Sequence, residues 1–198
     1  MKIEILNRIT FAELEKMLRR VPLMAIAEDG SQIYIYKDAR ITLKNLSAEE
    51  VNPPTFYIIK RNLQLQRDVR ESLLNQYNID LFNLNGALEI KNEQKEIWTL
   101  TPPIIEVVSR IVSYVPQGGE IDHRSKQIKI LIPTLADGSH RGALARRLGL
   151  PFNAVYISEI DEKHPTYYAH PNSWDKVQEV EDTPKTMSDK KLYRLEKH

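Results

Sequence analysis

The sequence predicts an α/β (α+β) fold, in which helices and strands alternate along the chain. Two patterns support this prediction. Apolar residues recur at helical spacing in four segments, whereas in several others they alternate with polar residues as in half-buried strands. The hydrophobic share of 41% and the charged share of 28% are ordinary for a globular protein, and 198 residues suit one medium domain or a core with an appendage.

The first 95 residues are predicted to form an N-terminal mixed α/β region. Thr10 is a candidate N-cap with Glu13 three residues later, which is typical of a helix start. The turn signal Asp29-Gly30 lies between apolar segments and indicates a hairpin or small meander. The remaining elements expected in this region are a strand within 51–61, a helix within 63–78 and a hairpin that begins at 85.

Residues 96–160 are predicted to form the central unit. Thr101, the two prolines after it and a stripe of Ile and Val between 104 and 115 predict a helix. Alternating isoleucines predict a strand over 126–134. A helix is expected from about 140 to 148, since Gly149 is a typical C-terminal residue, and "FNAVYI" predicts a further strand.

Residues 161–198 are polar and charged, and we expect a surface-lying or partly disordered tail. The formal net charge of +1 gives no broad basic field for nonspecific nucleic-acid binding. The absence of cysteine excludes disulfides, thiolate nucleophiles and Cys-ligated zinc. With no signal-peptide pattern and no apolar run of membrane-spanning length, a cytoplasmic protein without a membrane partner is expected.

The junction "DGSHR", residues 137–141, carries the most chemistry in the chain. A helix start offers unpaired backbone N–H groups and a positive dipole end, which together bind anions. Gly138 would let a phosphate approach the backbone, Ser139 and His140 could donate hydrogen bonds to it, and Arg141 could hold it with two N–H groups. Asp137 could bind a hydrated Mg²⁺. The simpler alternative is an Asp-Gly turn followed by a capped, solvated helix start.

The stretch "IKILIPTLADGSHRGALARRLGLPFNAVYI" resembles the central part of the ParB/sulfiredoxin-like superfamily, whose pattern is a strand ending in DGxHR, a helix and a short strand. The resemblance covers about residues 98–160 and implies a ParB/sulfiredoxin-like core with an N-terminal mixed α/β extension. "LTPPIIEVVSRIVSYV" also resembles the Pro-plus-helix segment of free serine kinases, in which a Glu after the Pro is catalytic. This similarity assigns the catalytic base to Glu106.

Departures from the superfamily narrow this assignment. Sulfiredoxins need a catalytic Cys in the corresponding loop, which this chain lacks. Chromosome-partitioning ParB proteins carry a helix-turn-helix domain after the core, and we expect none within the short polar segment that follows here. The segment "QGGEIDHRSK" and the 95-residue leader also differ from the superfamily core and could select the substrate.

The resulting hypothesis is a Mg²⁺-dependent phosphotransferase with an unknown acceptor. By resemblance, residues 138–141 would bind the phosphates of ATP, ADP or CTP, and Glu106, Asp137 and His140 would be catalytic. The first alternative is a ParB-like protein that binds or cleaves nucleic acid without a helix-turn-helix domain. The second is a protein-interaction module with a vestigial loop.

Other polar residues give weaker signals. His164 and His170, with Asp161 and Glu162 nearby, fit no compact metal-ligand spacing. Trp174 is expected to pack on the core, together with Tyr167 and Tyr168. Arg146 and Arg147 favour a solvated helix face, although they could contact nucleic-acid phosphates.

Overall fold

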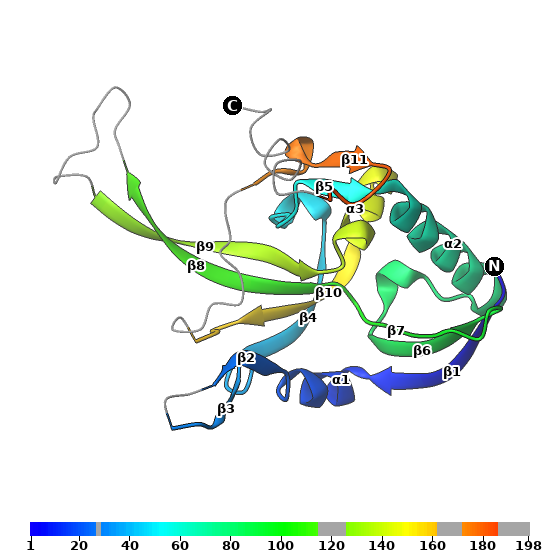
Figure 1. The fold of residues 1–198 in the computed structure, drawn as a ribbon, viewed down its shortest axis with the longest axis horizontal. Coiled ribbons are helices and arrows are strands. Elements are labelled where there is room, and N and C mark those ends of the chain that lie inside the picture. Colours follow the sequence, from blue (N-terminus) through cyan, green and yellow to red (C-terminus); the bar gives the residue numbers. More distant parts are fainter. Residues whose placement is uncertain (27–28, 115–125, 162–171, 186–198) are drawn as a thin grey trace.

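The computed structural model describes residues 1–26, 29–114, 126–161 and 172–185 as a mixed α/β fold (Figure 1), as the sequence predicts. Its helices and strands follow in this order: β1 (Ile3–Thr10), α1 (Phe11–Leu18), β2 (Pro22–Ile26), β3 (Gln32–Tyr34), β4 (Arg40–Leu46), β5 (Tyr57–Ile59), α2 (Lys60–Tyr77), β6 (Gly86–Asn92), β7 (Ile97–Leu100), β8 (Ile104–Tyr114), β9 (Lys126–Asp137), α3 (Ser139–Leu148), β10 (Phe152–Ser158) and β11 (Gln178–Val180). Short 3₁₀ turns lie at Ala48–Glu50, Leu81–Asn83 and Trp174–Lys176.

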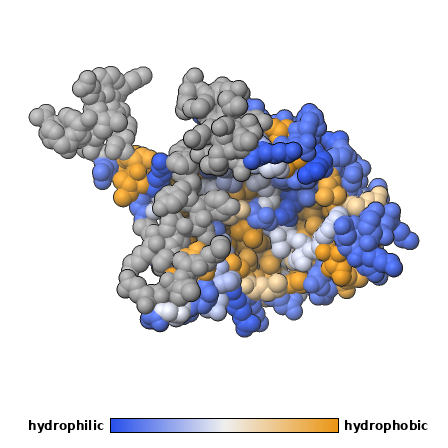
Figure 2. All heavy atoms as spheres, in the orientation of Figure 1, coloured by the Kyte–Doolittle hydropathy of each residue, from blue (hydrophilic) through white to orange (hydrophobic). Residues whose placement is uncertain are grey.

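The central sheet has the strand order β4-β10-β8-β9. Strand β10 runs antiparallel to β4 and parallel to β8, while β8 and β9 form a long antiparallel pair. Beyond the body of the protein this pair projects as a two-stranded ribbon (Figure 1). Orange, hydrophobic spheres appear on the projecting part in Figure 2, and its exposed large apolar side chains include Ile111, Ile128 and Leu131.

The helix predicted over 101–115 is wrong, because Ile104–Tyr114 form strand β8. The stripe that suggests a helix consists of isoleucine and valine, whose branched Cβ atoms favour an extended backbone. Each residue of β8 faces a partner on β9, and the first three also pair with β10. This pairing satisfies the backbone of both strands, so tertiary contacts decide the conformation of a segment whose periodicity alone is ambiguous.

The other predicted elements of the N-terminal region are confirmed. Helix α1 begins with a capping box between Thr10 and Glu13, and α2 ends at Asn78 in the left-handed conformation. Strands β2 and β3 form the predicted antiparallel hairpin, and β6 and β7 form another that β1 joins. Gly86 is required where β1 ends, since a Cβ there would lie 2.1 Å from the carbonyl oxygen of Ile9.

Three adjoining apolar clusters make up the described core, and they cross the predicted divisions 1–95, 96–160 and 161–198. The first packs α3 against one face of the central sheet and includes Phe82, Leu144 and Trp174. The second packs α1 and residues 35–41 against the opposite face. The third lies between α2 and the β1-β6-β7 sheet. The domain boundaries stay predictions, while the packing is continuous between these ranges.

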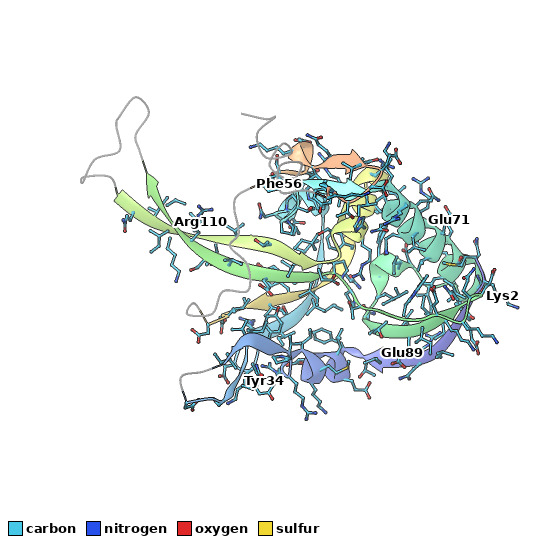
Figure 3. The ribbon with its side chains drawn as sticks, viewed as in Figure 1. Lys2, Tyr34, Phe56, Glu71, Glu89 and Arg110 are labelled. Carbon is cyan, nitrogen blue, oxygen red and sulfur yellow. The ribbon has the colours of Figure 1, made fainter. Side chains whose placement is uncertain are left out.

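Within the segment expected to be a tail, residues 172–185 include a 3₁₀ turn and strand β11, and part of this stretch is buried. Trp174 is 5% exposed, as its predicted core packing requires, and its indole nitrogen donates to the carbonyl oxygen of Ala48 at 2.7 Å. Strand β11 pairs in parallel with β5. Figure 3 labels Phe56, just before β5, whose carbonyl oxygen accepts from the backbone N–H of Gln178 at 2.9 Å. Among the described residues, no helix has the length and apolarity to cross a membrane.

Candidate phosphate-binding site

The site is built on the turn that joins β9 to α3. Gly138 has a φ of +90°, which side-chain-bearing residues rarely adopt. A Cβ at this position would also lie 3.0 Å from the Cβ of Pro103. Pro103, just ahead of β8, therefore packs against the turn instead of starting a helix. This position requires glycine for both backbone conformation and space.

Helix α3 begins with backbone donors that no side chain caps. Gly138 is the N-cap residue and makes no side-chain cap hydrogen bond. Its carbonyl oxygen accepts the first helical bond, from the N–H of Gly142 at 2.9 Å. The N–H groups of the three residues between them have no acceptor within the helix, and the positive end of the helix dipole adds to their field. The predicted anion-binding geometry is thus present in the backbone.

His140 has a defined tautomer. Its Nε2 atom accepts a hydrogen bond from the backbone N–H of Ile59 at 3.2 Å. Burial lowers the pKa of the imidazole from its ordinary value, which favours the neutral ring. The proton of a neutral ring that accepts at Nε2 is carried by Nδ1. His140 therefore joins α3 to β5 and keeps one N–H donor for a ligand.

Arg141 is turned into the protein and ties the turn to the segment before β8. The residue is 8% exposed, and its Nη1 atom donates to the carbonyl oxygen of Thr101. Its Nη2 atom donates to Oδ2 of Asp137 at 3.0 Å. Burial lowers the pKa of the guanidinium, and the carboxylate of Asp137 partly opposes this effect. Arg141 thus stabilises the turn, whereas the sequence suggests a side chain aimed at a phosphate.

A cavity of about 400 Å³ opens beside the start of α3. One wall is the turn and the first residues of α3, and the other comes from the segment around β5 and from α2. Its lining residues are Thr55, Tyr57, Ile58, Ile59, Gln66, Ala136, Asp137, Gly138, Ser139, His140 and Arg141. The five residues that the sequence singles out therefore line one concave site.

The second wall is held by polar contacts from both directions. The backbone of Asn52 bridges to β9, donating to the carbonyl oxygen of Pro133 at 2.7 Å and accepting from the N–H of Leu135 at 3.0 Å. The Nδ2 atom of Asn172 donates to the carbonyl oxygens of Pro53 at 3.2 Å and Thr55 at 3.1 Å. Segments far apart in sequence thereby fix the loop that faces α3.

Glu106, the predicted base, lies in a different environment. It is 1% exposed on β8 and accepts a hydrogen bond from the hydroxyl of Tyr36. Its neighbour Ile105 packs with the α3 cluster, whereas Tyr36 belongs to the cluster on the opposite face of the sheet. Glu106 is not among the residues that line the cavity beside α3. Its catalytic role stays a prediction.

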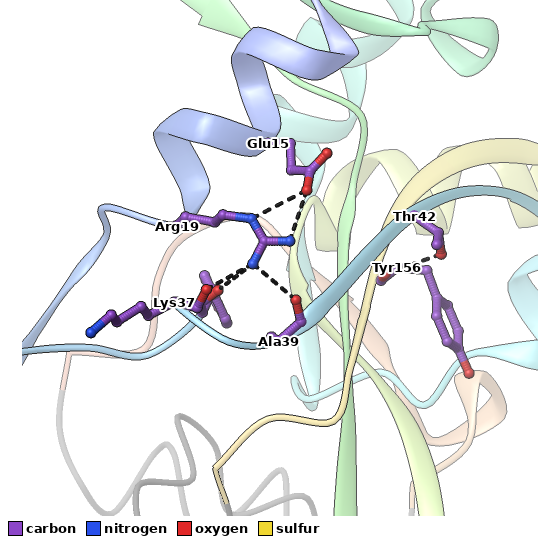
Figure 4. Close-up of polar contacts among 7 residues, drawn as sticks. Glu15, Arg19, Lys37, Ala39, Thr42 and Tyr156 are labelled. Atoms are coloured by element: carbon purple, nitrogen blue, oxygen red, sulfur yellow. Dashed lines mark hydrogen bonds and ion pairs between the residues drawn. The ribbon is translucent and has the colours of Figure 1, made fainter.

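Arg19 holds the segment that carries Tyr36 (Figure 4). Its Nη1 atom donates to the carbonyl oxygens of Tyr36, Lys37 and Ala39 at 3.3, 2.8 and 3.1 Å. The rest of its guanidinium donates to Oε1 of Glu15. The residue that follows α1 therefore positions the loop whose Tyr36 hydroxyl donates to Glu106.

The comparison with protein families matches residues 13–178 to the ParB CE domain. The chain belongs to the ParB CE domain family. The match includes most of α1, the central sheet, the cavity and the start of β11, and so extends well beyond the stretch that suggests a ParB-like core. No curated protein matches the chain. No solved structure matches it.

In this ParB CE domain protein, Arg146 and Arg147 do not form the open basic face expected of a nucleic-acid binder. Arg146 contacts Glu49 at 2.7 Å and Asp175 at 2.6 Å, which raise its pKa, and Arg147 contacts Glu179. The described residues contain no cluster of three or more metal-ligating side chains. His164 and His170 lie outside the described residues, as does the segment 117–125.

The residues that sequence reasoning misses are those of the second wall, above all Thr55, Tyr57 and Gln66. They lie more than 70 positions before the DGSHR turn and reach it only through the packing of α2 and β5 against α3. One signal is available in the sequence: Gln66 falls on the apolar stripe of α2, between Leu63 and Val69.

Proposed function

We propose that this ParB CE domain protein binds a nucleotide through its phosphates at the cavity beside α3, and that it acts as a Mg²⁺-dependent phosphotransferase. The observation that carries the proposal is the uncapped start of α3, which opens onto a cavity of about 400 Å³. A site of this size with convergent backbone donors suits a phosphorylated ligand.

The residues of the turn divide the work. Backbone N–H groups of residues 139–141 and the hydroxyl of Ser139 bind phosphate oxygens, and His140 donates from Nδ1. Arg141 keeps a positive charge directly behind the turn while holding its shape. These groups supply the charge neutralisation and positioning on which phosphoryl transfer depends.

Asp137 fits a Mg²⁺ site in which the nucleotide provides further ligands. Its side chain is 60% exposed, and Arg141 engages only Oδ2. Mg²⁺ commonly binds to one or two carboxylates together with phosphate oxygens and waters. The metal would neutralise phosphate charge, while Asp137 orients it at the end of β9.

Glu106 is retained as the candidate base that the resemblance assigns, and its contact with Tyr36 places it outside the cavity beside α3, so its role needs a test of its own. Glu106→Gln keeps the size of the side chain and removes its ability to take a proton. We expect this variant to bind nucleotide with unchanged affinity and to lose phosphoryl transfer. Transfer at the wild-type rate would remove Glu106 from the mechanism and leave nucleotide binding intact.

The first experiment is calorimetric titration of ATP, ADP and CTP, with and without Mg²⁺, into the wild type and His140→Ala. We expect micromolar binding of at least one nucleotide and at least a tenfold loss in the variant, equivalent to about 1.4 kcal/mol. Failure of the wild type to bind any of the three would overturn the proposal.

A pair of glycine variants provides the matched control. Gly138 and Gly149 lie at opposite ends of α3, both with positive φ, at +90° and +64°. Alanine strains the backbone at both positions, but only at Gly138 does it disturb the donors that face the cavity. Gly138→Ala should lose nucleotide binding, whereas folded Gly149→Ala should bind as the wild type does.

Nucleic-acid binding is the second candidate, because a separate groove is basic. Its lining includes Lys60, Arg61 and Arg67 of α2 together with Arg147 of α3, opposed by Glu179 and Glu181. A backbone contact through these residues should weaken by orders of magnitude between about 50 and 200 mM salt. Titrating a labelled duplex at both salt concentrations, with Arg61→Ala and Arg67→Ala as variants, tests this alternative.

A further inference from the structure

Helix α2 carries a carboxamide where its own pattern calls for an apolar side chain. Leu63, Val69 and Leu73 are 4%, 1% and 0% exposed and lie along the buried stripe of the helix. Gln66 stands three residues from both Leu63 and Val69, and therefore on the same stripe. Gln66 is also the residue through which α2 lines the cavity beside α3.

The carboxamide oxygen of Gln66 is buried and accepts no hydrogen bond. Other glutamines of α2 are satisfied: Nε2 of Gln64 donates to Asp68 at 2.7 Å, and Oε1 of Gln76 accepts from the N–H of Ile3 at 3.2 Å. A buried polar atom without a partner destabilises the fold relative to an apolar side chain of the same shape. Such a group is expected where a ligand supplies the missing partner.

We propose that Gln66 determines ligand specificity by accepting a hydrogen bond from an O–H or N–H group of the bound nucleotide. The inference rests on the proposed nucleotide site and adds that the site recognises a hydrogen-bond donor on the nucleoside part of the ligand. The start of α3 supplies donors for the anionic end of the ligand. Gln66 lines the same cavity, and rotation of its carboxamide brings Oε1, which is buried in the ligand-free protein, to the ligand. Inorganic polyphosphates have acceptors in abundance but no such donor group, so Gln66 favours nucleosides bearing phosphates over phosphate chains alone.

The presence of Tyr57 in the same lining fits this assignment. Its side chain is aromatic, in a lining whose other members are mainly polar, and nucleobases bind to aromatic rings by stacking. Donors on a nucleotide are carried by the sugar hydroxyls and by the exocyclic amino group of the base. Either source gives Oε1 of Gln66 the same chemical partner, and suitable nucleotides separate the two.

The test is calorimetric titration of ATP, 2′-deoxy-ATP, ITP and tripolyphosphate, each with Mg²⁺, into the wild type, Gln66→Met and Gln64→Met. Methionine keeps the length of the side chain and removes the carboxamide. Gln64 lies on the same helix, is exposed and is absent from the lining of this cavity, so its variant is the matched control. Thermal unfolding of the three ligand-free proteins accompanies the titrations.

We expect Gln66→Met to bind ATP about tenfold more weakly, while tripolyphosphate binding changes by less than about twofold. Gln64→Met should match the wild type with both ligands. In the wild type, a weaker affinity for 2′-deoxy-ATP identifies the sugar as the donor, and a weaker affinity for ITP identifies the base amino group. Ligand-free Gln66→Met should unfold about 2–4 °C higher, because the unpaired buried oxygen is gone.

The outcomes separate this inference from the function on which it rests. Equal ATP affinity of Gln66→Met and the wild type overturns the role of Gln66 and leaves the nucleotide site standing. An equal loss in Gln64→Met also overturns it. If the wild type binds neither ATP nor tripolyphosphate, the proposed function fails and the role of Gln66 fails with it.

Discussion

At the scale of single residues, the neutral state of His140 is built into the fold. Its Nε2 atom accepts from Ile59, and burial lowers its pKa below the ordinary value of 6.5. Above that value the imidazole is neutral in both the folded and the unfolded chain, so it adds no pH dependence. As the pH falls below it, the unfolded chain takes up a proton before the folded protein does, and the free energy of unfolding decreases.

This linkage predicts the behaviour of His140→Gln. The difference in unfolding free energy between the wild type and the variant should be constant above about pH 7. Towards pH 5 the wild type should lose stability relative to the variant. For one proton its slope cannot exceed about 1.4 kcal/mol per pH unit. Urea denaturation at several pH values measures the difference. A shift in favour of the wild type on acidification would mean that His140 has a raised pKa.

Single residues also show why the DGSHR turn can be predicted from the sequence. Asp137 to Arg141 are consecutive, and the requirement for glycine at 138 follows from local backbone geometry. The orientation of the Arg141 side chain cannot be predicted from the sequence, because its acceptor is the carbonyl oxygen of Thr101, 40 positions earlier. The unpaired oxygen of Gln66 likewise depends on how α2 packs against α3.

At the scale of elements, local signals identify the helices, and tertiary pairing decides the strands. Helix α1 has its capping box and α3 ends at Gly149 in the left-handed conformation, so both ends can be predicted from neighbouring residues. Strand β8 cannot, because its apolar residues also fit a helical stripe. Its partner β9 supplies the backbone bonds that select the extended form.

The link between α1 and the Tyr36 segment gives an element-scale prediction. Arg19→Lys keeps the charge but replaces a planar group that donates to three carbonyl oxygens and to Glu15. We expect the free energy of unfolding to fall by about 1–2 kcal/mol. Arg20→Lys, at the exposed neighbouring position, should change it by less than about 0.5 kcal/mol. Urea denaturation of both variants makes the comparison, and equal stabilities would mean that the Arg19 contacts add nothing.

At the scale of the whole molecule, the three apolar clusters share helices and strands, so they do not divide the chain into separately packed units. Leu63 of α2 belongs to the α3 cluster, while Val69 of the same helix belongs to the cluster against β6. Strand β6 likewise places Ala87 in the α1 cluster and Leu88 in the α2 cluster. No local sequence signal predicts this sharing, because which cluster a residue joins depends on the elements that pack against each side of its helix or strand. A protein packed in this way should unfold as one cooperative unit.

The two tryptophans of the chain test this cooperativity directly. Trp98 packs against the α2 cluster, and Trp174 is buried in the α3 cluster. In Trp98→Phe, fluorescence reports only on Trp174, and in Trp174→Phe only on Trp98. Within each variant, the urea midpoint from fluorescence should equal the midpoint from far-ultraviolet circular dichroism, because loss of either cluster removes packing from α2 and β6. Separate midpoints within one variant would show that the N-terminal sheet and the central sheet unfold independently, and would favour a domain boundary near residue 96.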